Sequence, residues 1–243
     1  MISMTPKVSC VLPVYNGERY LKESIDSVIN QTFTDWELII INDGSTDNTR
    51  AILDAQTDER IRIYHNERNR KLPATLNRGF LVARGEYWTW TSHDNRYLPF
   101  AFGTMVNALT DSPGDIVYSD YSIIDATGKR VAGCSAPLPE HLKYQNSVHA
   151  SFMFRPHVWH DLKGYDEGLF RAEDWDFWIR AWLAGMKFRT IPFPLYEYRV
   201  HDEMLCHNWW ACQVAYAKTA ARHFGVARAV KQFGCAALQV VKT

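Results

Sequence analysis

The sequence has no excess of charge of either sign, because 27 lysines and arginines balance 27 aspartates and glutamates in a chain of 243 residues. A neutral chain offers no broad electrostatic field for nucleic acid or for an acidic partner, so we expect no nucleic-acid function. The five cysteines contain no C-x-x-C pair and no zinc-ligand spacing. Such an odd, scattered set of cysteines indicates a reducing compartment.

Long apolar segments and targeting signals are also missing. No apolar run reaches the length of roughly 20 residues that crosses a bilayer. The first residues, M-I-S-M-T-P-K, lack the charged, apolar and small-residue order of a secretory signal. Internal repeats and low-complexity segments are absent as well. These absences predict a cytoplasmic globular protein made of one domain, or of one domain with an appendage.

What the sequence does contain is an ordinary globular composition, with 47% hydrophobic and 22% charged residues. Short apolar runs alternate with helical patterns over the first hundred residues. The predicted strands are Val8–Val14, Trp36–Ile41, Ile61–Tyr64 and Tyr87–Thr91. Strands that alternate with helices predict an α/β fold, with a Rossmann-like and mostly parallel central sheet flanked by helices.

The pattern is less regular after residue 99. The segment from Asp125 to Gln145 contains glycine and proline but few periodic apolar residues, and this predicts an irregular surface excursion. Elsewhere the periodicities predict helices over Pro99–Ser112, Phe152–Leu162 and Glu173–Ala184, and strands over Asp115–Ile124, Phe188–Ile191 and Tyr196–Val200.

The last forty residues, 204–243, form a basic tail, because no acid follows Glu203. The basic residues are Lys218, Arg222, Arg228, Lys231 and Lys242. Apolar residues recur in the tail at helical spacing, at Val226, Val230, Phe233, Ala237 and Val240. This spacing predicts one amphipathic helix, or a pair of helices broken near Gly225. The favoured interpretation is a terminal helix docked on the domain. The alternative is a weak anchor on an anionic membrane surface, which would make the protein peripheral on the inner face of the plasma membrane.

Polar side chains follow three of the predicted parallel strands. Tyr15 follows the first strand, Asp43 the second and Asp94 the fourth. The carboxyl ends of parallel strands meet at one edge of a sheet, where α/β folds bind ligands. Tyr15 offers a flat face for a base, Asp43 can accept hydrogen bonds from a base or ribose, and Asp94 offers a hard oxygen for Mg²⁺ or Mn²⁺. Each residue alone has a structural alternative, since Asp43 could form a turn and Tyr15 could belong to the core.

Several ordered motifs resemble those of the family 2 inverting nucleotide-sugar glycosyltransferases, which have the GT-A fold, over residues 7–203. They are V-L-P-V-Y-N-G (11–17), S-V-I-N-Q-T (27–32), I-I-I-N-D-G-S-T-D (39–47), L-N-R-G (76–79), S-H-D-N (92–95), G-Y-D-E (164–167), A-E-D-W-D-F-W-I-R (172–180) and Y-R-V-H-D (198–202). The resemblance implies a nucleotide-binding half over 1–99 and an acceptor and catalytic half over 100–203, with the tail at 204–243. Acceptor choice is expected to depend on Asp125–Ser151 in the second half.

The resemblance also implies a donor site. Its nucleotide-binding residues, with uridine as the usual base, would be Pro13, Tyr15, Asp43, Asn77, His93, Asp94 and Arg199. The implied cofactor is a divalent metal, Mn²⁺ or Mg²⁺, bound by Asp94 in the D-x-D position and by His201. Ser92 stands where the family has the first aspartate of that motif, and Asn95 stands where it has a neighbouring acid. Arg199 would help to neutralise the leaving group.

The resemblance implies that the catalytic residues are the E-D pair, Glu173 and Asp174. Asp174 is predicted to be the general base, and Glu173 to position the acceptor. An acceptor hydroxyl is a poor nucleophile until a carboxylate takes its proton, and the attack must come from the side opposite the diphosphate. The structural alternative is that both acids merely begin a helix, where carboxylates are favoured by exposed N–H groups.

The predicted function is therefore transfer of a sugar from a nucleoside diphosphate sugar to a saccharide or lipid-linked acceptor, in assembly of a cell-surface polysaccharide or glycolipid. One alternative is a nucleotide-sugar-forming nucleotidyltransferase. That enzyme would need a glycine-rich, arginine-containing loop after the first strand to hold a triphosphate, and this chain has only Asn16-Gly17-Glu18-Arg19 there. The other alternative is a sugar-binding or nucleotide-binding module without transfer activity.

Overall fold

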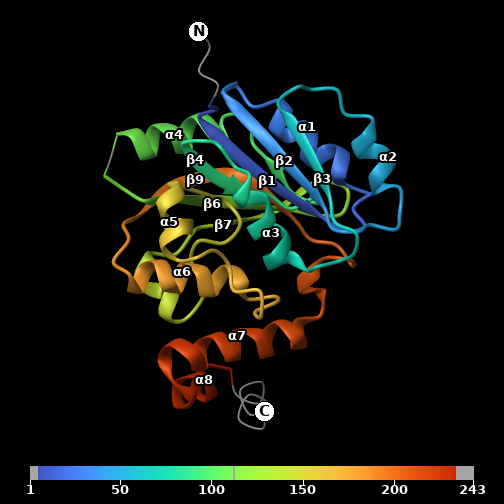
Figure 1. The fold of residues 1–243 in the computed structure, drawn as a ribbon. Helices are drawn as coiled ribbons and strands as arrows, with labels where there is room; N and C mark the ends of the chain where they lie inside the picture. Colours follow the sequence, from blue (N-terminus) through green and yellow to red (C-terminus); the bar gives the residue numbers. More distant parts are fainter. Residues whose placement is uncertain (1–4, 112, 234–243) are drawn as a thin grey trace.

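The computed structural model describes residues 5–111 and 113–233, and its central feature is a mixed sheet between two layers of helices (Figure 1). Over these residues the strands are β1 (Val8–Val14), β2 (Trp36–Asn42), β3 (Ile61–His65), β4 (Tyr87–Trp90), β5 (Arg96–Tyr97), β6 (Ile116–Ile124), β7 (Arg130–Cys134), β8 (Phe152–Phe154) and β9 (Phe188–Arg199). Their order is β3-β2-β1-β4-β8-β6-β9-β5, and β7 pairs with β6 outside this order. β1 to β4 run parallel, whereas β8 is antiparallel to both of its neighbours. The predicted α/β fold with a mostly parallel sheet is confirmed.

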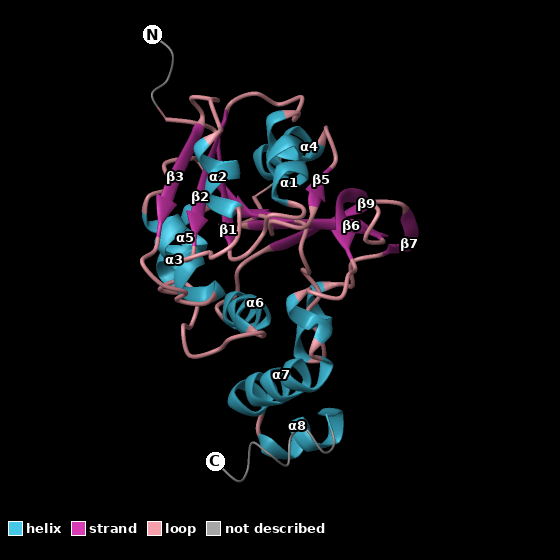
Figure 2. Cartoon of the chain, turned by 90° about the vertical axis from the view of Figure 1, so that its right-hand side faces the viewer, coloured by secondary structure: helices cyan, strands magenta, loops and turns pink. Residues whose placement is uncertain are grey.

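The helices divide between the two faces of the sheet. They are α1 (Leu21–Ile29), α2 (Thr49–Asp54), α3 (Leu72–Leu81), α4 (Ala101–Thr110), α5 (Pro156–Asp161), α6 (Glu173–Leu183), α7 (Trp209–Phe224) and α8 (Val226–Phe233), with 3-10 turns η1 (Pro139–Lys143) and η2 (Leu205–His207). Helices α1, α2 and α4 cover one face, and α3, α5 and α6 cover the other (Figure 2). The sheet is therefore covered on both sides, which explains why β1 and β2 are buried along their whole length and mostly apolar, rather than alternating between apolar and polar residues.

Alternate residues of β1 belong to two separate cores. Cys10 and Leu12 pack with the helices of one face, and Val11 packs with Leu76 of α3 on the other. Helix α3 approaches β1 closely at Gly79, where a Cβ atom would overlap the Cγ1 atom of Val11. The first helix–strand layer therefore depends on a residue without a side chain at this position.

We expect the substitution Gly79→Ala to lower the free energy of unfolding by about 1–3 kcal/mol, because an added methyl group must push α3 away from β1. The matched control is Gly103→Ala in α4, where the nearest atom to the new Cβ would be Phe33 Cβ at 3.6 Å. That alanine should leave stability unchanged or raise it slightly through helix propensity. Urea denaturation of both variants measures the difference, and equal stabilities would contradict the close-packing argument.

The prediction of a helix over Phe152–Leu162 was wrong at its beginning. Phe152–Phe154 is strand β8, which lies between β4 and β6, and the helix begins only at Pro156. A short buried apolar run has no periodicity that separates a strand from a helix. Pairing with strands that are distant in the sequence decided between them, and Pro156 at the first helical position then opened α5.

Two further predictions of the second half need correction. The segment Asp125–Gln145 is not wholly irregular, because it contains β7 and η1. The two short strands predicted at Phe188–Ile191 and Tyr196–Val200 are parts of the single strand β9. The β6–β9 register shifts where Pro194 pairs with Asp120. A proline in a strand is tolerated at such an irregularity. In the sequence pattern, however, the irregularity indicated the end of one strand and the beginning of another.

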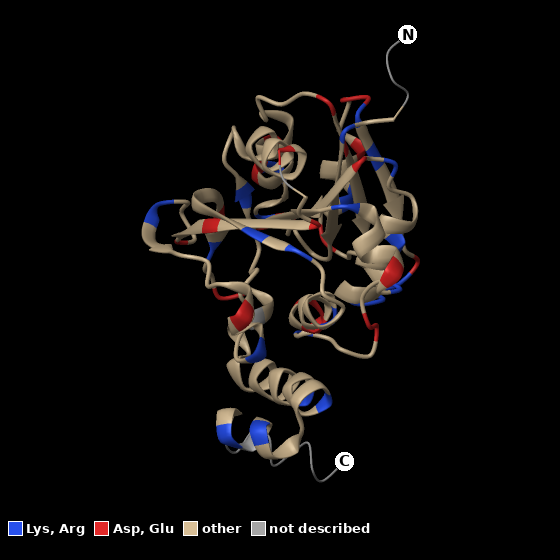
Figure 3. Cartoon of the chain, turned by 90° about the vertical axis from the view of Figure 1, so that its left-hand side faces the viewer, with Lys and Arg blue, Asp and Glu red and all other residues tan. Residues whose placement is uncertain are grey.

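The tail forms α7 and α8, which are joined at Gly225 with a φ of 87° and carry lysine and arginine but no acid (Figure 3). Tyr216 of α7 contacts Trp175 of α6 edge-to-face, and Ala229 of α8 is buried. The predicted break and the favoured docked arrangement are therefore confirmed through Phe233. The predicted helical positions Ala237 and Val240, and Lys242, lie outside the described residues.

Within the described part, every helix is too short or too polar to cross a membrane, and the membrane-anchor alternative stays a hypothesis.

Candidate active site

Two adjoining cavities lie where β1, β2 and β4 end. The first, which we call the Asp43 cavity, has a volume of about 380 Å³ and is lined by Pro13, Tyr15, Asp43 and His93 among others. The second, the Asp174 cavity, has a volume of about 420 Å³. Both cavities are lined by Ser92, Asp94, Leu72, Arg171, Met204 and Leu205.

The Asp43 cavity brings together residues that the sequence predicted as one site. Tyr15 is 43% exposed, which excludes its placement in the core. Asp43 is buried, and its carboxylate accepts hydrogen bonds from Asn66 Nδ2 at 2.6 Å and from the backbone N–H of Arg70 at 2.9 Å and Lys71 at 3.0 Å. Asp43 therefore organises the segment before α3 as well as lining the cavity, so its structural and functional interpretations are compatible.

Asp94 lies at the boundary of the two cavities and contacts His201. The backbone N–H of Glu203 donates to His201 Nδ1 at 3.3 Å, so the ring proton is on Nε2, which donates to Asp94 Oδ2 at 3.0 Å. Burial would raise the pKa of Asp94, but the hydrogen bond from His201 and the nearby His93 outweigh it and lower the pKa. The carboxylate is therefore ionised at neutral pH.

The second oxygen of Asp94 makes this corner suitable for a cation. Asp94 Oδ1 is buried and has no hydrogen-bond partner among the described residues. A buried anionic oxygen without a partner is costly unless a ligand satisfies it. Oxygen from a carboxylate and nitrogen from an imidazole are suitable donors for a divalent metal ion. Asp94 therefore fits the predicted metal. His201 fits it through Nε2 once a metal ion replaces the proton that this nitrogen shares with Asp94.

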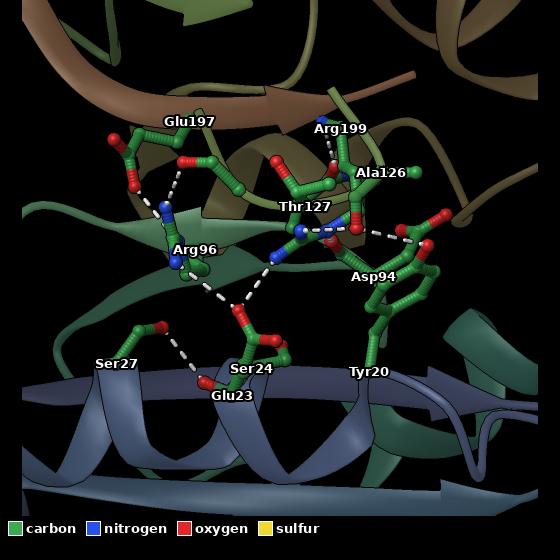
Figure 4. A network of polar contacts seen from close by, with 12 residues as sticks. Tyr20, Glu23, Ser24, Ser27, Asp94, Arg96, Ala126, Thr127, Glu197 and Arg199 are labelled. Atoms are coloured by element: carbon green, nitrogen blue, oxygen red, sulfur yellow. Dashed lines mark hydrogen bonds and ion pairs between the residues drawn. The ribbon is translucent and has the colours of Figure 1, made fainter. Parts of the chain in front are cut away.

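Arg199 does not lie in the lining of either cavity, and its predicted role of helping to neutralise the leaving group stays a prediction. Its side chain is fully buried, and its Nε donates to the carbonyl oxygen of Asp94 at 2.9 Å. Its Nη2 contacts Glu23 at 2.7 Å, and Glu23 also pairs with Arg96 (Figure 4). The guanidinium also lies 4.4 Å from the ring centre of Tyr20. Arg199 therefore holds the loop that carries Asp94.

Asn77 also lies outside the lining of both cavities. Its Nδ2 donates to the carbonyl oxygen of Tyr165 at 2.9 Å, and its Oδ1 accepts from the N–H of the same residue at 2.8 Å. This paired contact fastens the 164–167 turn to α3. The L-N-R-G motif thus has a structural explanation here, and the predicted nucleotide contact of Asn77 is not supported by its position.

Glu173 and Asp174 begin α6 and face the Asp174 cavity. Asp174 Oδ2 accepts from Asn146 Nδ2 at 2.7 Å, and Oδ1 accepts from the N–H of Trp175 at 2.7 Å. Burial raises the pKa of Asp174 to about 6. Burial and the neighbouring charge of Asp174 raise the pKa of Glu173 to about 8. At neutral pH the first acid is therefore mainly ionised, and the second mainly protonated.

We expect the substitution Glu173→Gln to stabilise the folded protein at pH 8 but not at pH 5. The pKa of Glu173 is higher in the folded chain than in the unfolded chain, so the folded state keeps a proton that the unfolded state has lost. This cost grows as pH rises from about 4.5 to about 8. A neutral amide avoids it, so the melting temperature at pH 8 should rise by several degrees, with about 1 kcal/mol moving it by roughly 2–4 °C. A gain of the same size at pH 5 would contradict this account.

The Asp174 cavity also contains residues that the sequence did not single out. Asn146 and His149 come from the segment that was expected to govern acceptor choice, and the backbone of His149 has a φ of 53°. Tyr216 and Phe233 come from the tail. The first two carry no motif. Phe233 was identified only as a member of a helical pattern and Tyr216 was not identified, so no sequence signal pointed to the cavity.

Comparisons with known proteins agree with this geometry. A model of the family described as Glycosyl transferase family 2 matches residues 9–171. An uncharacterized glycosyltransferase of Rickettsia bellii is 32% identical over 213 residues, which cover 82% of this chain and 30% of the relative. The putative glycosyltransferase EpsE of Bacillus subtilis is 32% identical over 203 residues, which cover 80% of this chain and 73% of the relative. The chain thus spans less than a third of the length of the Rickettsia relative.

Solved structures share the fold. S. aureus TarS in complex with UDP-GlcNAc superposes with a TM-score of 0.72 at 18% identity, over 90% of this chain and 67% of that one. The mannosyltransferase PcManGT from Pyrobaculum calidifontis, in complex with GDP-Man and Mn²⁺, superposes with a TM-score of 0.68 at 18% identity, over 94% of this chain and 65% of that one.

Proposed function

The chain belongs to glycosyl transferase family 2, and from this premise we propose that it transfers a sugar from a nucleoside diphosphate sugar to an acceptor hydroxyl, with inversion at the anomeric carbon. One observation carries the proposal. Asp94 has one carboxylate oxygen without a hydrogen-bond partner among the described residues, and it stands between the cavity of Tyr15 and Asp43 and the cavity of Asp174. A donor and an acceptor could thus meet at Asp94.

The donor would bind in the Asp43 cavity, with its base against Tyr15 and its diphosphate directed toward Asp94. The two structural neighbours described above bind UDP-GlcNAc and GDP-Man, and a uridine nucleotide is the prediction for this chain. A divalent cation would be held by Asp94 and His201, and when bound it would neutralise charge that develops on the departing diphosphate. Arg199 would keep the Asp94 loop in position through its bond to the Asp94 carbonyl.

The acceptor would enter through the Asp174 cavity. Asp174 is mainly ionised at neutral pH, so its carboxylate can take the proton of the acceptor hydroxyl as that oxygen attacks the sugar. Glu173 is mainly protonated, so it can donate a hydrogen bond to an acceptor oxygen and orient it. Asn146, bonded to Asp174 Oδ2, holds the base and favours its ionised form.

We expect the transfer rate to fall as pH is lowered through about 6, because protonated Asp174 cannot accept the hydroxyl proton. The rate at saturating donor should be measured across pH 5 to 8. In the variant Asn146→Ala the whole profile should move to higher pH, because the hydrogen bond from Asn146 lowers the pKa of Asp174. A flat profile, or an unshifted one in that variant, would exclude Asp174 as the base.

The experiment that tests the proposed function is release of nucleoside diphosphate from UDP-GlcNAc, UDP-glucose, UDP-galactose and GDP-mannose, with Mn²⁺ and with EDTA. Metal-stimulated release of the diphosphate supports transfer. Release of pyrophosphate from a nucleoside triphosphate and a sugar phosphate would instead support the nucleotidyltransferase alternative. Binding of a nucleotide-sugar without turnover would support the binding-module alternative.

The loop after β1 favours transfer over nucleotide-sugar formation. Its backbone N–H groups at Asn16 and Gly17 already donate to Ser45 Oγ at 3.0 Å and Thr49 Oγ1 at 2.9 Å. The N–H of Glu18 donates to Asp47 at 3.0 Å. N–H groups bonded in this way are not available to cradle a triphosphate. The predicted setting, assembly of a cell-surface polysaccharide or glycolipid with a saccharide or lipid-linked acceptor, stays a prediction.

A further inference from the structure

The wall of the Asp174 cavity is built partly by the C-terminal tail. Tyr216 of α7 and Phe233 of α8 line it, and their rings lie 5.4 and 6.0 Å from that of Trp175. Tyr144 lines the same cavity, and Arg228 of α8 stacks 4.7 Å from its ring centre. Aromatic side chains from three separate segments therefore meet opposite the paired acids of α6.

Buried charge holds the tail in this place. The carboxylate of Asp176 is fully buried and contacts His223 Nε2 at 2.7 Å and Arg222 Nη1 at 3.6 Å. Arg222 also pairs with Asp166 at 2.5 Å. Asp176 also pairs with Arg180 of its own helix at 2.7 Å, so it would keep one partner without the tail. The loss of a hydrogen-bonded partner by a buried carboxylate is still costly, and the contacts from His223 and Arg222 therefore hold α7 against α6. The aromatic wall is accordingly a defined surface.

The polar lining of the cavity selects against anions. Among the residues that line it, Asp94 and Asp174 are ionised carboxylates and Glu173 is mainly protonated. Arg171 is a cation, and its Nη1 donates to the carbonyl oxygen of Leu205 at 2.8 Å. Burial lowers the pKa of His149 to about 4, so its imidazole is neutral. A phosphate or carboxylate near Asp174 would meet repulsion, whereas hydroxyl groups can bond to the acids, the amides and the imidazole.

Taking the proposed function as its basis, we infer that Tyr216 and Phe233 of the tail, with Tyr144 and Trp175, form the subsite for an uncharged sugar ring of the acceptor. The apolar C–H face of such a ring packs on aromatic faces, while its hydroxyl groups point toward Glu173, Asp174 and Asn146. Tyr216 and Phe233 are then specificity-determining residues, because the tail sets the width of the acceptor cavity.

The test measures binding of methyl glycosides of glucose, galactose, mannose and N-acetylglucosamine to the full chain by ligand-observed NMR, with and without UDP and Mg²⁺. At least one glycoside should bind the unmodified chain. Phe233→Ala should weaken that binding roughly tenfold, while Phe233→Tyr keeps an aromatic face and should stay within about twofold of it. If Phe233→Ala fails to fold in a thermal melt, Phe233→Leu replaces it, since leucine keeps the apolar bulk without the ring.

The matched control is Phe224→Ala. Phe224 belongs to the same tail and packs on the same core, but it lies outside the lining of both cavities. It should leave glycoside binding within about twofold of the unmodified chain. Equal losses in the Phe224 and Phe233 variants, or no binding of any glycoside to the unmodified chain, would overturn the inference.

The outcomes separate this inference from the proposed function. A chain that releases nucleoside diphosphate from a donor but binds no glycoside would leave the proposed function standing and overturn the tail subsite. A chain that binds a glycoside in a manner dependent on Phe233, but turns over no donor, would keep the subsite and overturn the transferase.

Discussion

The substitution Asp174→Asn should lower the rate of sugar transfer by about a thousandfold, within the range that a positioned general base contributes. Asparagine has nearly the same shape as aspartate but cannot take the proton of the acceptor hydroxyl. The donor would bind in the Asp43 cavity, so the affinity of the protein for the donor should change little. The measurement is the transfer rate at saturating donor, together with donor affinity from a thermal-shift titration.

The comparison variant is Glu173→Gln. Glu173 is mainly protonated at neutral pH because of burial and the neighbouring Asp174, and glutamine resembles that neutral form. We therefore expect a loss of only about tenfold or less, since a hydrogen bond to the acceptor is weakened but the base remains. A loss in Glu173→Gln as large as that in Asp174→Asn would reverse the assignment of the two acids.

The substitution Asp94→Asn should lower metal-stimulated release of nucleoside diphosphate by roughly two orders of magnitude or more, because charge stabilisation by a metal ion is worth several kcal/mol. Asp94 Oδ1 is a buried carboxylate oxygen without a partner among the described residues. An amide there removes the negative charge. Mn²⁺ should then no longer increase the thermal stabilisation that UDP produces, because a ligand stabilises only the state that binds it.

The control for Asp94 is Asp202→Asn. His201, Asp202 and Glu203 have possible metal-ligand atoms within 4.8 Å of one another, but the two acids are exposed and face Arg19 at 3.4 and 3.8 Å. Exposed charges in water contribute little, so this variant should keep most of the response to Mn²⁺. An equally large loss of the Mn²⁺ response in Asp202→Asn would indicate that the metal binds at this exposed cluster and not at Asp94.

The donor side of the candidate site was readable from the sequence for a geometric reason. Tyr15, Asp43 and Asp94 each follow a strand of a parallel set, and parallel strands bring their carboxyl ends to one edge. The structure accordingly places all three around the Asp43 cavity. Motif matching did not indicate that Arg199 and Asn77 lie outside the cavity linings, because a motif names a residue but not the direction of its side chain.

The sequence by itself determined the α/β class, the first four strands, and the convergence of Tyr15, Asp43 and Asp94, because these follow from local periodicity and the rule that parallel strands share an edge. The tertiary structure alone decided that Phe152–Phe154 joins the sheet, that Arg199 is buried beneath the Asp94 loop, and that the tail closes the Asp174 cavity. Each depends on contacts between segments that are distant along the chain. Side-chain burial and charge pairing across such distances leave no periodic trace in the sequence.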